Sequence, residues 1–303
     1  MDKVLITGIT GFLGSHIAKA LVQNGTQVIG LKRVTSDTWR CKDFLNQIDW
    51  VDIDQQGNWK DTIINKQPQF VVHCAWIGVE AKDRNNWGEQ IKNIYFLNDL
   101  IEIVNAIKLS KFVFIGSQSE YGEISGKISE QEPPHALNAY SGIKLACLEM
   151  MKAFCESNQI NWIWLRLFSV FGENESSNWL IPQVINRMLN DNEMDFTACD
   201  QKYAYLYVDD FAKVIMRILS HNISSGIYNI SSNEARPLRL IIEQIRDIVN
   251  PDFKLNFGAL PYRENQSMHL EGDISKLTQQ IGELEFTDFN TAIQKTVKPY
   301  MSK

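Results

Sequence analysis

Short runs of apolar residues alternate with longer stretches of helical period along most of the chain. Such runs are typical of parallel strands buried on both faces, because a strand exposed on one face alternates apolar with polar positions. The runs that we interpret as strands cover residues 4–6, 27–31, 49–54, 70–76, 112–117, 161–167 and 226–231. The helical patterns cover residues 15–23, 91–107, 138–157, 180–191, 209–220 and 237–249. This alternation predicts an α/β fold built on a doubly wound parallel sheet.

Three glycines stand between the first expected strand and the first expected helix. Gly8 allows a tight exit from the strand, Gly11 lets the backbone approach a pyrophosphate, and Gly14 lets the helix pack closely on the strand. The free N–H groups of the first helical turn, from Phe12 and Leu13 to Gly14, favour an anion together with the helix dipole. The context of strand, glycines and helix predicts a dinucleotide site. The alternative is an ordinary glycine-rich turn.

The end of the second expected strand bears on the choice of dinucleotide. An acidic residue there accepts the ribose 2′-hydroxyl of NAD, whereas cations there bind the 2′-phosphate of NADP. This chain has Lys32 and Arg33, with no acid before Asp37. We therefore expect NADP(H), while Asp37 keeps NAD possible. The alternative interpretation is a solvated basic pair on a loop.

Composition and charge exclude several classes of protein. The 303 residues suffice for a large core, and 44% hydrophobic with 22% charged residues is typical of a globular protein. The net charge of −6 and the lack of a basic run argue against a nucleic-acid partner. No apolar run approaches the ~20 residues of a membrane span, so no membrane partner is expected. The N-terminus enters a strand directly, which argues against a signal peptide. Five scattered cysteines indicate reduced thiols in the cytoplasm, and no spacing suggests a metal site.

The motif T-G-x-x-G-x-x-G, from Thr7 to Gly14, resembles that of the extended short-chain dehydrogenase/reductase family. Later segments carry the same resemblance: Y-x-x-x-K at residues 140–144, F-S-V-F-G at 168–172 and Y-V-D-D at 207–210. Because these motifs span most of the chain, the resemblance implies one fold with two interleaved parts. They are a dinucleotide-binding domain, residues 1–168, and a smaller C-terminal substrate lobe, residues 169–303.

The resemblance also implies further cofactor contacts. Asp52 and Ile53 match the pair that frames the adenine, with a solvent-facing carboxylate as the alternative. Ala75 is small enough to lie along the cofactor, and Ser169 stands where the family has an asparagine. The neighbouring His73 is expected to be a packed, hydrogen-bonded residue rather than a base.

The expected chemistry depends on Tyr140 and Lys144, which share one face of a helix at positions i and i+4. A phenol has a reference pKa of about 10, and a nearby ammonium lowers that pKa toward the working pH. Ser117 follows the fifth strand, at the edge where open α/β sheets bind ligands. By resemblance, the nicotinamide exchanges hydride with a carbonyl carbon, Tyr140 moves the proton, and Ser117 steadies the oxygen. Chance occurrence on a surface helix is the alternative for Y-x-x-x-K, and a strand-end cap is the alternative for Ser117.

The residues after Ser117 separate the reactions of this family. The 4,6-dehydratases carry Thr-Asp-Glu where this chain has Ser117, Gln118 and Ser119, so the acid and base of dehydration are missing. Glu120 lies one position further on and, in an extended backbone, points to the other face. The segment G-S-Q-S-E-Y-G looks like that of nucleotide-sugar 4-ketoreductases that make deoxyhexoses, such as the CDP-abequose synthase group. We expect NADPH-dependent reduction of a nucleotide-linked 4-keto-6-deoxyhexose. An NAD-dependent UDP-sugar 4-epimerase is the runner-up, and a dinucleotide-binding sensor without catalysis is a third hypothesis.

Substrate contacts and assembly follow from the same resemblance. Arg263 is the candidate for the substrate diphosphate, because guanidinium binds phosphate bidentately. Tyr203-Ala204-Tyr205 replaces the R-D-F of many relatives, which puts a second phosphate contact in doubt. Trp76, Gln118 and Asn178 are candidates for the sugar or base site, and loop packing is the alternative for Asn178. Relatives dimerise through helices like those near 91–107 and 140–157, so we expect a homodimer, with burial inside the monomer as the alternative. The apolar residues that suggest this interface are Cys147, Met150, Met151 and Phe154.

Overall fold

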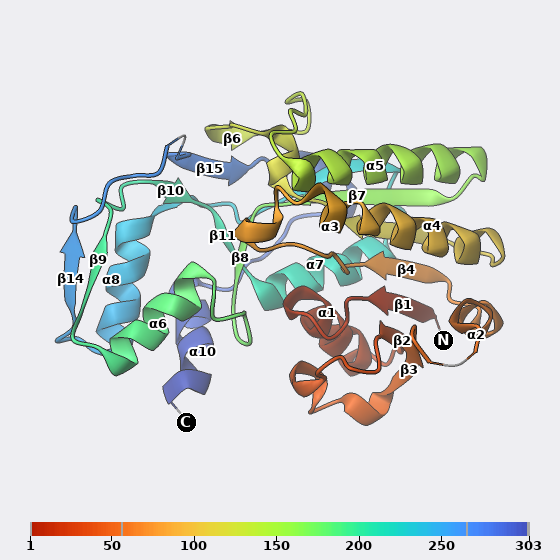
Figure 1. Ribbon diagram of the computed structural model, residues 1–303, viewed down its shortest axis with the longest axis horizontal. Coiled ribbons are helices and arrows are strands. Elements are labelled where there is room, and N and C mark those ends of the chain that lie inside the picture. The colour runs from red at the N-terminus through yellow and green to blue at the C-terminus, as the bar shows by residue number, and fades with distance from the viewer. Residues whose placement is uncertain (1, 56, 265, 302–303) are drawn as a thin grey trace.

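A seven-stranded parallel sheet forms the centre of the protein (Figure 1). The computed structural model describes residues 2–55, 57–264 and 266–301. The strands are β1 (Lys3–Thr7), β2 (Gln27–Lys32), β3 (Ile48–Asp52), β4 (Phe70–His73), β5 (Lys111–Ile115), β7 (Asn161–Leu167) and β12 (Gly226–Ile230). Their order in the sheet is β12-β7-β5-β4-β1-β2-β3. The chain starts in the middle at β1, runs outward to β3 and returns through β4 on the other side. This reversal confirms the doubly wound, Rossmann-like fold and puts a switch point between β1 and β4.

Helices cover both faces of this sheet. One face carries α2 (Trp59–Lys66), α4 (Lys92–Asn105) and α5 (Ala139–Ser157), whose apolar residues form a continuous core with the sheet. The other face carries α1 (Phe12–Gln23), α7 (Val208–Ser220) and α9 (Ser275–Ile281). Both faces of the strands are therefore buried, which is why their sequences are continuous apolar runs.

The second part of the chain adds a smaller group of helices and short strands, at the left of Figure 1. Its helices are α6 (Leu180–Asn190), α8 (Leu238–Val249) and α10 (Phe289–Met301), and they share one apolar core. Its strands are β8 (Ser169–Phe171) with β11 (Tyr205–Tyr207), β9 (Glu193–Phe196) with β14 (Lys254–Phe257), and a sheet of β13 (Arg236–Pro237), β10 (Lys202–Tyr203), β15 (His269–Gly272) and β6 (Gly126–Ile128). The remaining short elements are α3 (Trp87–Gln90) and the 3₁₀ turns Trp39–Cys41, Leu45–Gln47, Ala81–Asp83 and Gln118–Tyr121.

The two parts are intertwined along the chain. β12 pairs in parallel with β7, and α7 lies beside α1, although both elements follow residue 168. The expected helix over 91–107 is α4, and the short helix α3 precedes it. All five cysteines are free thiols. Within the described ranges, no helix is long and apolar enough to cross a membrane.

Candidate active site

The glycine-rich loop forms a tight cradle at the carboxyl end of β1. Gly8 has φ +68°, and a Cβ added there would lie 2.6 Å from the backbone nitrogen of Ala75. A Cβ on Gly14 would lie 2.3 Å from the carbonyl oxygen of Gly8, so the helix can approach the loop only without that side chain. Gly11 begins α1 without a side-chain cap, and the first turn holds no acidic residue. The first N–H groups of α1 are thus left for an anion, and these residues fit the pyrophosphate of a dinucleotide.

Thr7, at the end of β1, joins the cradle to β4. Its hydroxyl lies 2.6 Å from Nδ1 of His73 and accepts the backbone N–H of Ala75 at 3.3 Å. Complete burial lowers the pKa of His73 to about 3 and keeps the ring neutral. His73 therefore holds two strands together, in line with the structural role that the sequence indicates, and Ala75 lies beside the glycine loop.

One of the two cations that the sequence places at the end of β2 is paired with an acid in the structure. Lys32 donates to Asp52 at 2.5 Å, and both side chains are largely buried. The backbone N–H of Ile53 bonds to the carbonyl of Lys32, which keeps the ends of β2 and β3 together. Lys32 and Asp52 thus neutralise each other, and the exposed Arg33 is left as the cation of the predicted pair.

Arg40 is a second basic residue on this side, and the sequence interpretation missed it. Its Nε donates to the carbonyl of Asn174 at 2.8 Å, and its other nitrogens reach the carbonyl of Thr10 at 3.4 Å and the hydroxyl of Ser176 at 3.3 Å. Burial lowers the pKa of Arg40. This arginine links the glycine loop to a loop that is more than 130 residues away in sequence, a contact that no local pattern reveals.

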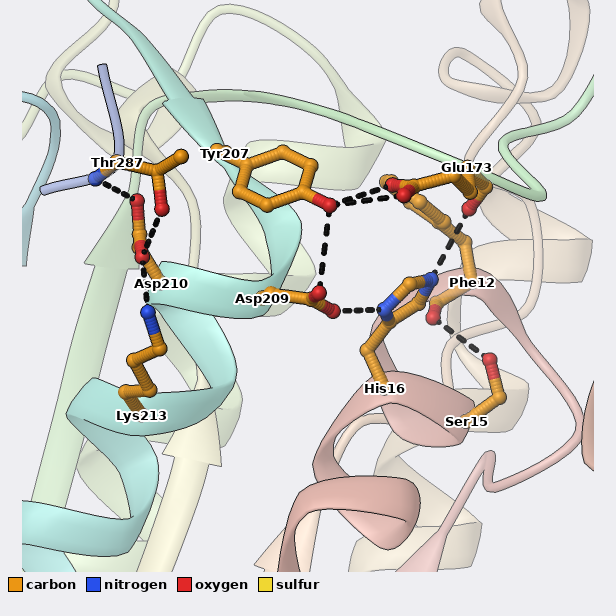
Figure 2. A network of polar contacts seen from close by, with 9 residues as sticks. All are labelled: Phe12, Ser15, His16, Glu173, Tyr207, Asp209, Asp210, Lys213 and Thr287. Atoms are coloured by element: carbon orange, nitrogen blue, oxygen red, sulfur yellow. Dashed lines mark hydrogen bonds and ion pairs between the residues drawn. The ribbon is translucent and has the colours of Figure 1, made fainter. Parts of the chain in front are cut away.

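A polar network ties α1 to α7 and to the loop after β8 (Figure 2). Nδ1 of His16 lies 2.7 Å from Asp209, and its Nε2 lies 3.0 Å from the carbonyl oxygen of Glu173. The hydroxyl of Tyr207 donates to the Glu173 carboxylate at 2.8 Å and lies 3.3 Å from Asp209. The first aspartate of the Y-V-D-D motif therefore fixes the helix that follows the glycine loop.

The catalytic candidates Ser117, Tyr140 and Lys144 meet at the carboxyl end of β5. The Ser117 hydroxyl is close enough to the Tyr140 phenol to oppose the rise in its pKa. Nζ of Lys144 donates to the carbonyl of Ile115 at 2.7 Å and lies 3.7 Å from the ring centroid of Trp76. The ring of Trp76 packs edge-on against that of Tyr140 at 5.8 Å. The structure therefore brings the three residues together with Trp76.

The sequence predicts that Lys144 lowers the pKa of the Tyr140 phenol, and the structure does not show this effect. Burial raises the pKa of Tyr140, and the groups that oppose this rise are the Ser117 hydroxyl and the Arg84 guanidinium, which lies 5.0 Å from the ring centroid. Burial lowers the pKa of Lys144 itself to about 8. Arg84 comes from the polar loop before α3, where the sequence offered no motif. In the protein alone, Tyr140 is therefore a protonated phenol at neutral pH.

Glu120 lies in a turn, so the extended backbone on which its predicted direction depended is absent. Residues Gln118–Tyr121 form a 3₁₀ turn rather than an extended strand, and Ser117 caps this turn by accepting the N–H of Ser119. Glu120 turns into the protein interior, where it is 0% exposed. Neither Gln118 nor Ser119 supplies an acid or base, so the loop lacks the groups of a dehydratase.

The remaining substrate candidates are more dispersed. Asn178 is exposed and donates to Glu80 at 3.0 Å, which joins the loop before α6 to the loop before α3. Arg263 is exposed, Gln118 is half-buried, and Ser169 lies in β8 opposite Tyr205. The structure therefore groups Trp76 with the catalytic residues and leaves Arg263 at the surface. Within the described ranges, no cluster of three or more His, Cys, Asp or Glu side chains could hold a metal ion.

Comparisons with known proteins agree with this geometry. Residues 4–231 match the model of the NAD dependent epimerase/dehydratase family. The chain is 28% identical to CDP-abequose synthase of Salmonella muenchen, over 99% of this chain and 97% of the relative. It is 24% identical to dTDP-6-deoxy-L-talose 4-dehydrogenase (NAD(+)) of Aggregatibacter actinomycetemcomitans, over 89% and 99%. Its fold matches UDP-N-acetylglucosamine 4-epimerase of Methanobrevibacter ruminantium M1 with a TM-score of 0.88 at 23% identity, over 99% and 98% of the two chains. The family match covers about three-quarters of the chain and contains the glycine cradle and the catalytic candidates, so this protein belongs to the NAD dependent epimerase/dehydratase family.

Proposed function

We propose that the protein reduces the 4-keto group of a nucleotide-linked 4-keto-6-deoxyhexose with NADPH. The observation that carries the proposal is the loop after β5. It presents Ser117 beside Tyr140, and it offers Gln118 and Ser119 instead of a second acid and base. Such a loop retains the groups for hydride and proton exchange at one carbon and lacks those for loss of water.

Two relatives support a redox reaction on a deoxyhexose. One bears the name of a 6-deoxytalose 4-dehydrogenase. Another, at 22% identity over 93% of this chain, is the GDP-6-deoxy-D-mannose reductase of Pseudomonas aeruginosa. Both names describe oxidation or reduction of a nucleotide-linked 6-deoxysugar, as does the reaction that we propose.

The protonation of Tyr140 supports the reductive direction. Reduction of a carbonyl needs a proton donor at the oxygen, and the raised pKa keeps this phenol in the donating form. Ser117 is placed to hydrogen-bond the same oxygen, and the Lys144 ammonium adds positive charge where negative charge develops. A nicotinamide held by the glycine cradle would supply the hydride.

The preference for NADP(H) rests on Arg33. Because Lys32 is neutralised by Asp52, Arg33 is the exposed cation of the pair that would face a 2′-phosphate. We expect Arg33→Ala to raise the KM for NADPH about tenfold and to leave the KM for NADH nearly unchanged, which corresponds to the loss of one charged contact. Equal effects on both coenzymes would contradict the preference.

A UDP-sugar 4-epimerase with tightly held NAD is the second candidate. The Lys32–Asp52 pair favours it, because this pair removes one of the two cations that would recognise a 2′-phosphate. An epimerase keeps its coenzyme through the reaction and consumes none, which separates the two functions experimentally.

The test is NADPH oxidation by the purified protein over a panel of nucleotide-linked 4-keto-6-deoxysugars, with UDP-sugars as epimerase substrates in parallel. Consumption of NADPH with one panel member supports reduction, and interconversion of UDP-sugars without net consumption supports the epimerase. Tyr140→Phe is the matched control, and we expect a 10²- to 10⁴-fold lower kcat, the usual size of general acid catalysis. An unchanged rate in this variant would contradict both functions.

We propose further that Trp76 and Gln118 line the sugar site and that Arg263 and Asn178 contact the rest of the substrate. The exposed guanidinium of Arg263 is free to meet a diphosphate, in keeping with a role that begins only when substrate binds. We propose as well that residues 1–168 form the dinucleotide-binding domain and residues 169–303 the substrate lobe.

We also propose a homodimer, through the first of the two expected helices rather than through the apolar residues of the second. Cys147 and Met151 are buried inside the monomer, so they cannot form an interface. Exposed apolar side chains gather instead at the start of α4: Trp87 on α3, Ile91 between the two helices and Tyr95 on α4, and Trp87 and Tyr95 are more than 60% exposed. A second copy of this chain would cover them. We expect a dimer mass in light scattering and a monomer after Tyr95→Glu.

A further inference from the structure

The catalytic loop holds a carboxylate that has no part in the proton transfer described above. Oε1 of Glu120 accepts the backbone N–H of Ser117 at 2.8 Å, and Nε1 of Trp164 lies 3.0 Å from both carboxylate oxygens. Oε2 accepts from Nε of Arg166 at 2.9 Å. All of these neighbours are donors, so an ionised carboxylate satisfies every one of them, whereas a protonated carboxyl would set its O–H against a donor.

Burial raises the pKa of Glu120, and its surroundings oppose this rise through Arg166, the N–H of Ser117 and Lys144. A Cβ added to Gly116 would lie 2.2 Å from Nε1 of Trp164 and 2.7 Å from Oε1 of Glu120, so glycine is required there. The Arg166 guanidinium, itself 1% exposed, lies 4.2 Å from the centroid of the Tyr121 ring. Removing two ions from water costs free energy, and complementary contacts such as these offset that cost.

The ion pair is oriented relative to α5. Glu120 raises the pKa of both Tyr140 and Lys144, whereas Arg166 is not among the groups of the described residues that act on either. The carboxylate, whose Oε1 accepts the N–H of Ser117, is therefore the member of the pair that acts on the catalytic tyrosine and lysine. The titratable and charged groups around Glu120 are Tyr121, Tyr140, Lys144, Cys147 and Arg166.

We propose that Glu120 is a positioning residue, whose buried carboxylate fixes the backbone of Ser117 and sets a negative charge beneath the Tyr140–Lys144 pair. This charge favours the ammonium form of Lys144 against the effect of burial. It also favours the protonated phenol, which donates in reduction. The inference rests on the proposed function only for its effect on turnover, since titration of the two residues needs no substrate.

The test is titration of the Glu120→Gln variant by NMR with ¹³C-labelled tyrosine and lysine, with signals assigned through Tyr140→Phe and Lys144→Met. We expect Tyr140 and Lys144 both to titrate at lower pH than in the original protein, with Lys144 falling from about 8 toward neutrality. With an active panel substrate, we expect kcat to fall at least about tenfold with little change in KM, because Ser117 is no longer held in register. The pH profile of kcat should move to lower pH.

Asp210→Asn provides a matched control. Asp210 is another buried carboxylate, held by Thr287 and Lys213 (Figure 2), and it does not act on the pKa of Tyr140 or Lys144 within the described residues. If Glu120→Gln does not fold, Glu120→Gln with Arg166→Met removes both charges and should shift the two titrations in the same direction. Unchanged titrations in a folded variant would overturn the proposal even if activity fell. Failure of the original protein to turn over any panel substrate would count against the proposed function alone.

Discussion

Two polar networks hold the two sides of the candidate site, and they are built differently. Beneath the catalytic loop, Glu120 and Arg166 form an ion pair with 0% and 2% side-chain exposure. Beside the glycine loop, His16 pairs with Asp209, whose side chain is 37% exposed. The first pair joins the turn after β5 to the neighbouring strand β7, whereas the second links α1 to α7 and to the loop after β8.

This difference indicates which of the two networks can rearrange. An arginine keeps its charge at any physiological pH, and its contact with Glu120 opposes the rise that burial causes in the pKa of that carboxyl. A histidine pairs with a carboxylate as an ion only when it is protonated, and water reaches Asp209. The catalytic side is thus fixed, and the link between the cofactor loop and the second part of the chain is adjustable.

The largest expected effect comes from breaking the buried pair. Arg166→Leu leaves the Glu120 carboxylate without its counter-ion in the interior, so we expect a loss of about 3–5 kcal/mol in the free energy of unfolding. Urea unfolding followed by far-UV circular dichroism measures this loss. Glu120→Gln with Arg166→Leu should cost clearly less, because no charge is then left unpaired. A loss below about 1 kcal/mol in the single variant would show that water reaches the carboxylate.

The second prediction concerns Glu175, in the loop that Arg40 and His16 hold. Burial raises the pKa of its carboxyl to about 8, and its Oε2 is buried with no hydrogen-bond partner among the described residues. The folded state therefore keeps a proton that the unfolded chain releases near its ordinary pKa. As a result, stability falls as the pH rises from the ordinary carboxyl range to about 8. Glu175→Gln should remove this fall, on the order of 4 kcal/mol by pH 8.

Thermal or urea unfolding of both proteins at mildly acidic pH and near pH 8 measures the change. Glu193→Gln is a suitable control, because Glu193 is an exposed carboxylate of the same part of the chain and its pKa is lowered by Asn256 and Lys254. If the original protein and Glu175→Gln showed the same pH dependence, the carboxyl would be solvated.

The sequence predicts the central sheet because its strands are buried on both faces. Every apolar run that we assigned to it, from β1 to β12, lies in the sheet, with shifts of a few residues at the ends. The glycine cradle is equally local, since Gly8 and Gly14 meet within one turn of chain. Tyr140 and Lys144 are also predictable, because i and i+4 share a helix face.

The features that the sequence did not predict depend on distant contacts. Lys32 meets Asp52 across two strands, and Arg40 meets a loop more than 130 residues away, so neither partner is visible in a local pattern. The short strands of the second part, such as β10 and β13, have two residues each and carry no alternation to detect. Glu120 appeared out of place in its motif because its partners, Trp164 and Arg166, come from β7.

The third prediction concerns the network of His16 and Asp209 beside the glycine loop. Asp209→Asn removes the charge that pairs with His16 and should cost about 1 kcal/mol of stability, less than the buried pair because Asp209 is partly exposed. Burial raises the pKa of Asp209, but the bonds from His16 outweigh it, and the pKa is lowered overall. Its stabilisation is therefore present above the ordinary aspartate pKa and is lost as the pH falls through the lowered value. Unfolding at neutral pH and near pH 3 tests both statements, and a variant as pH-sensitive as the original would contradict them.

The smallest effect is expected at Arg40, which holds the loop after β8 over the glycine cradle. Arg40→Lys keeps the charge, but one ammonium cannot reach the carbonyls of Thr10 and Asn174 and the hydroxyl of Ser176 together. We expect a change of about 0.5–1 kcal/mol in the free energy of unfolding, the size of one or two neutral-acceptor hydrogen bonds. We also expect the affinity for the dinucleotide, measured by calorimetry, to fall about two- to fivefold, since the cradle is less restrained.

Arg33→Lys separates this effect from a loss of charge recognition. Arg33 is exposed and its side chain lies outside the loop contacts that Arg40 makes, so its replacement by lysine should leave stability unchanged. If Arg33→Lys weakened the protein as much as Arg40→Lys, general electrostatics would explain both variants. If only Arg40→Lys acts, the cofactor side is held by hydrogen bonds between distant loops, and the contrast with the buried ion pair under the catalytic loop stands.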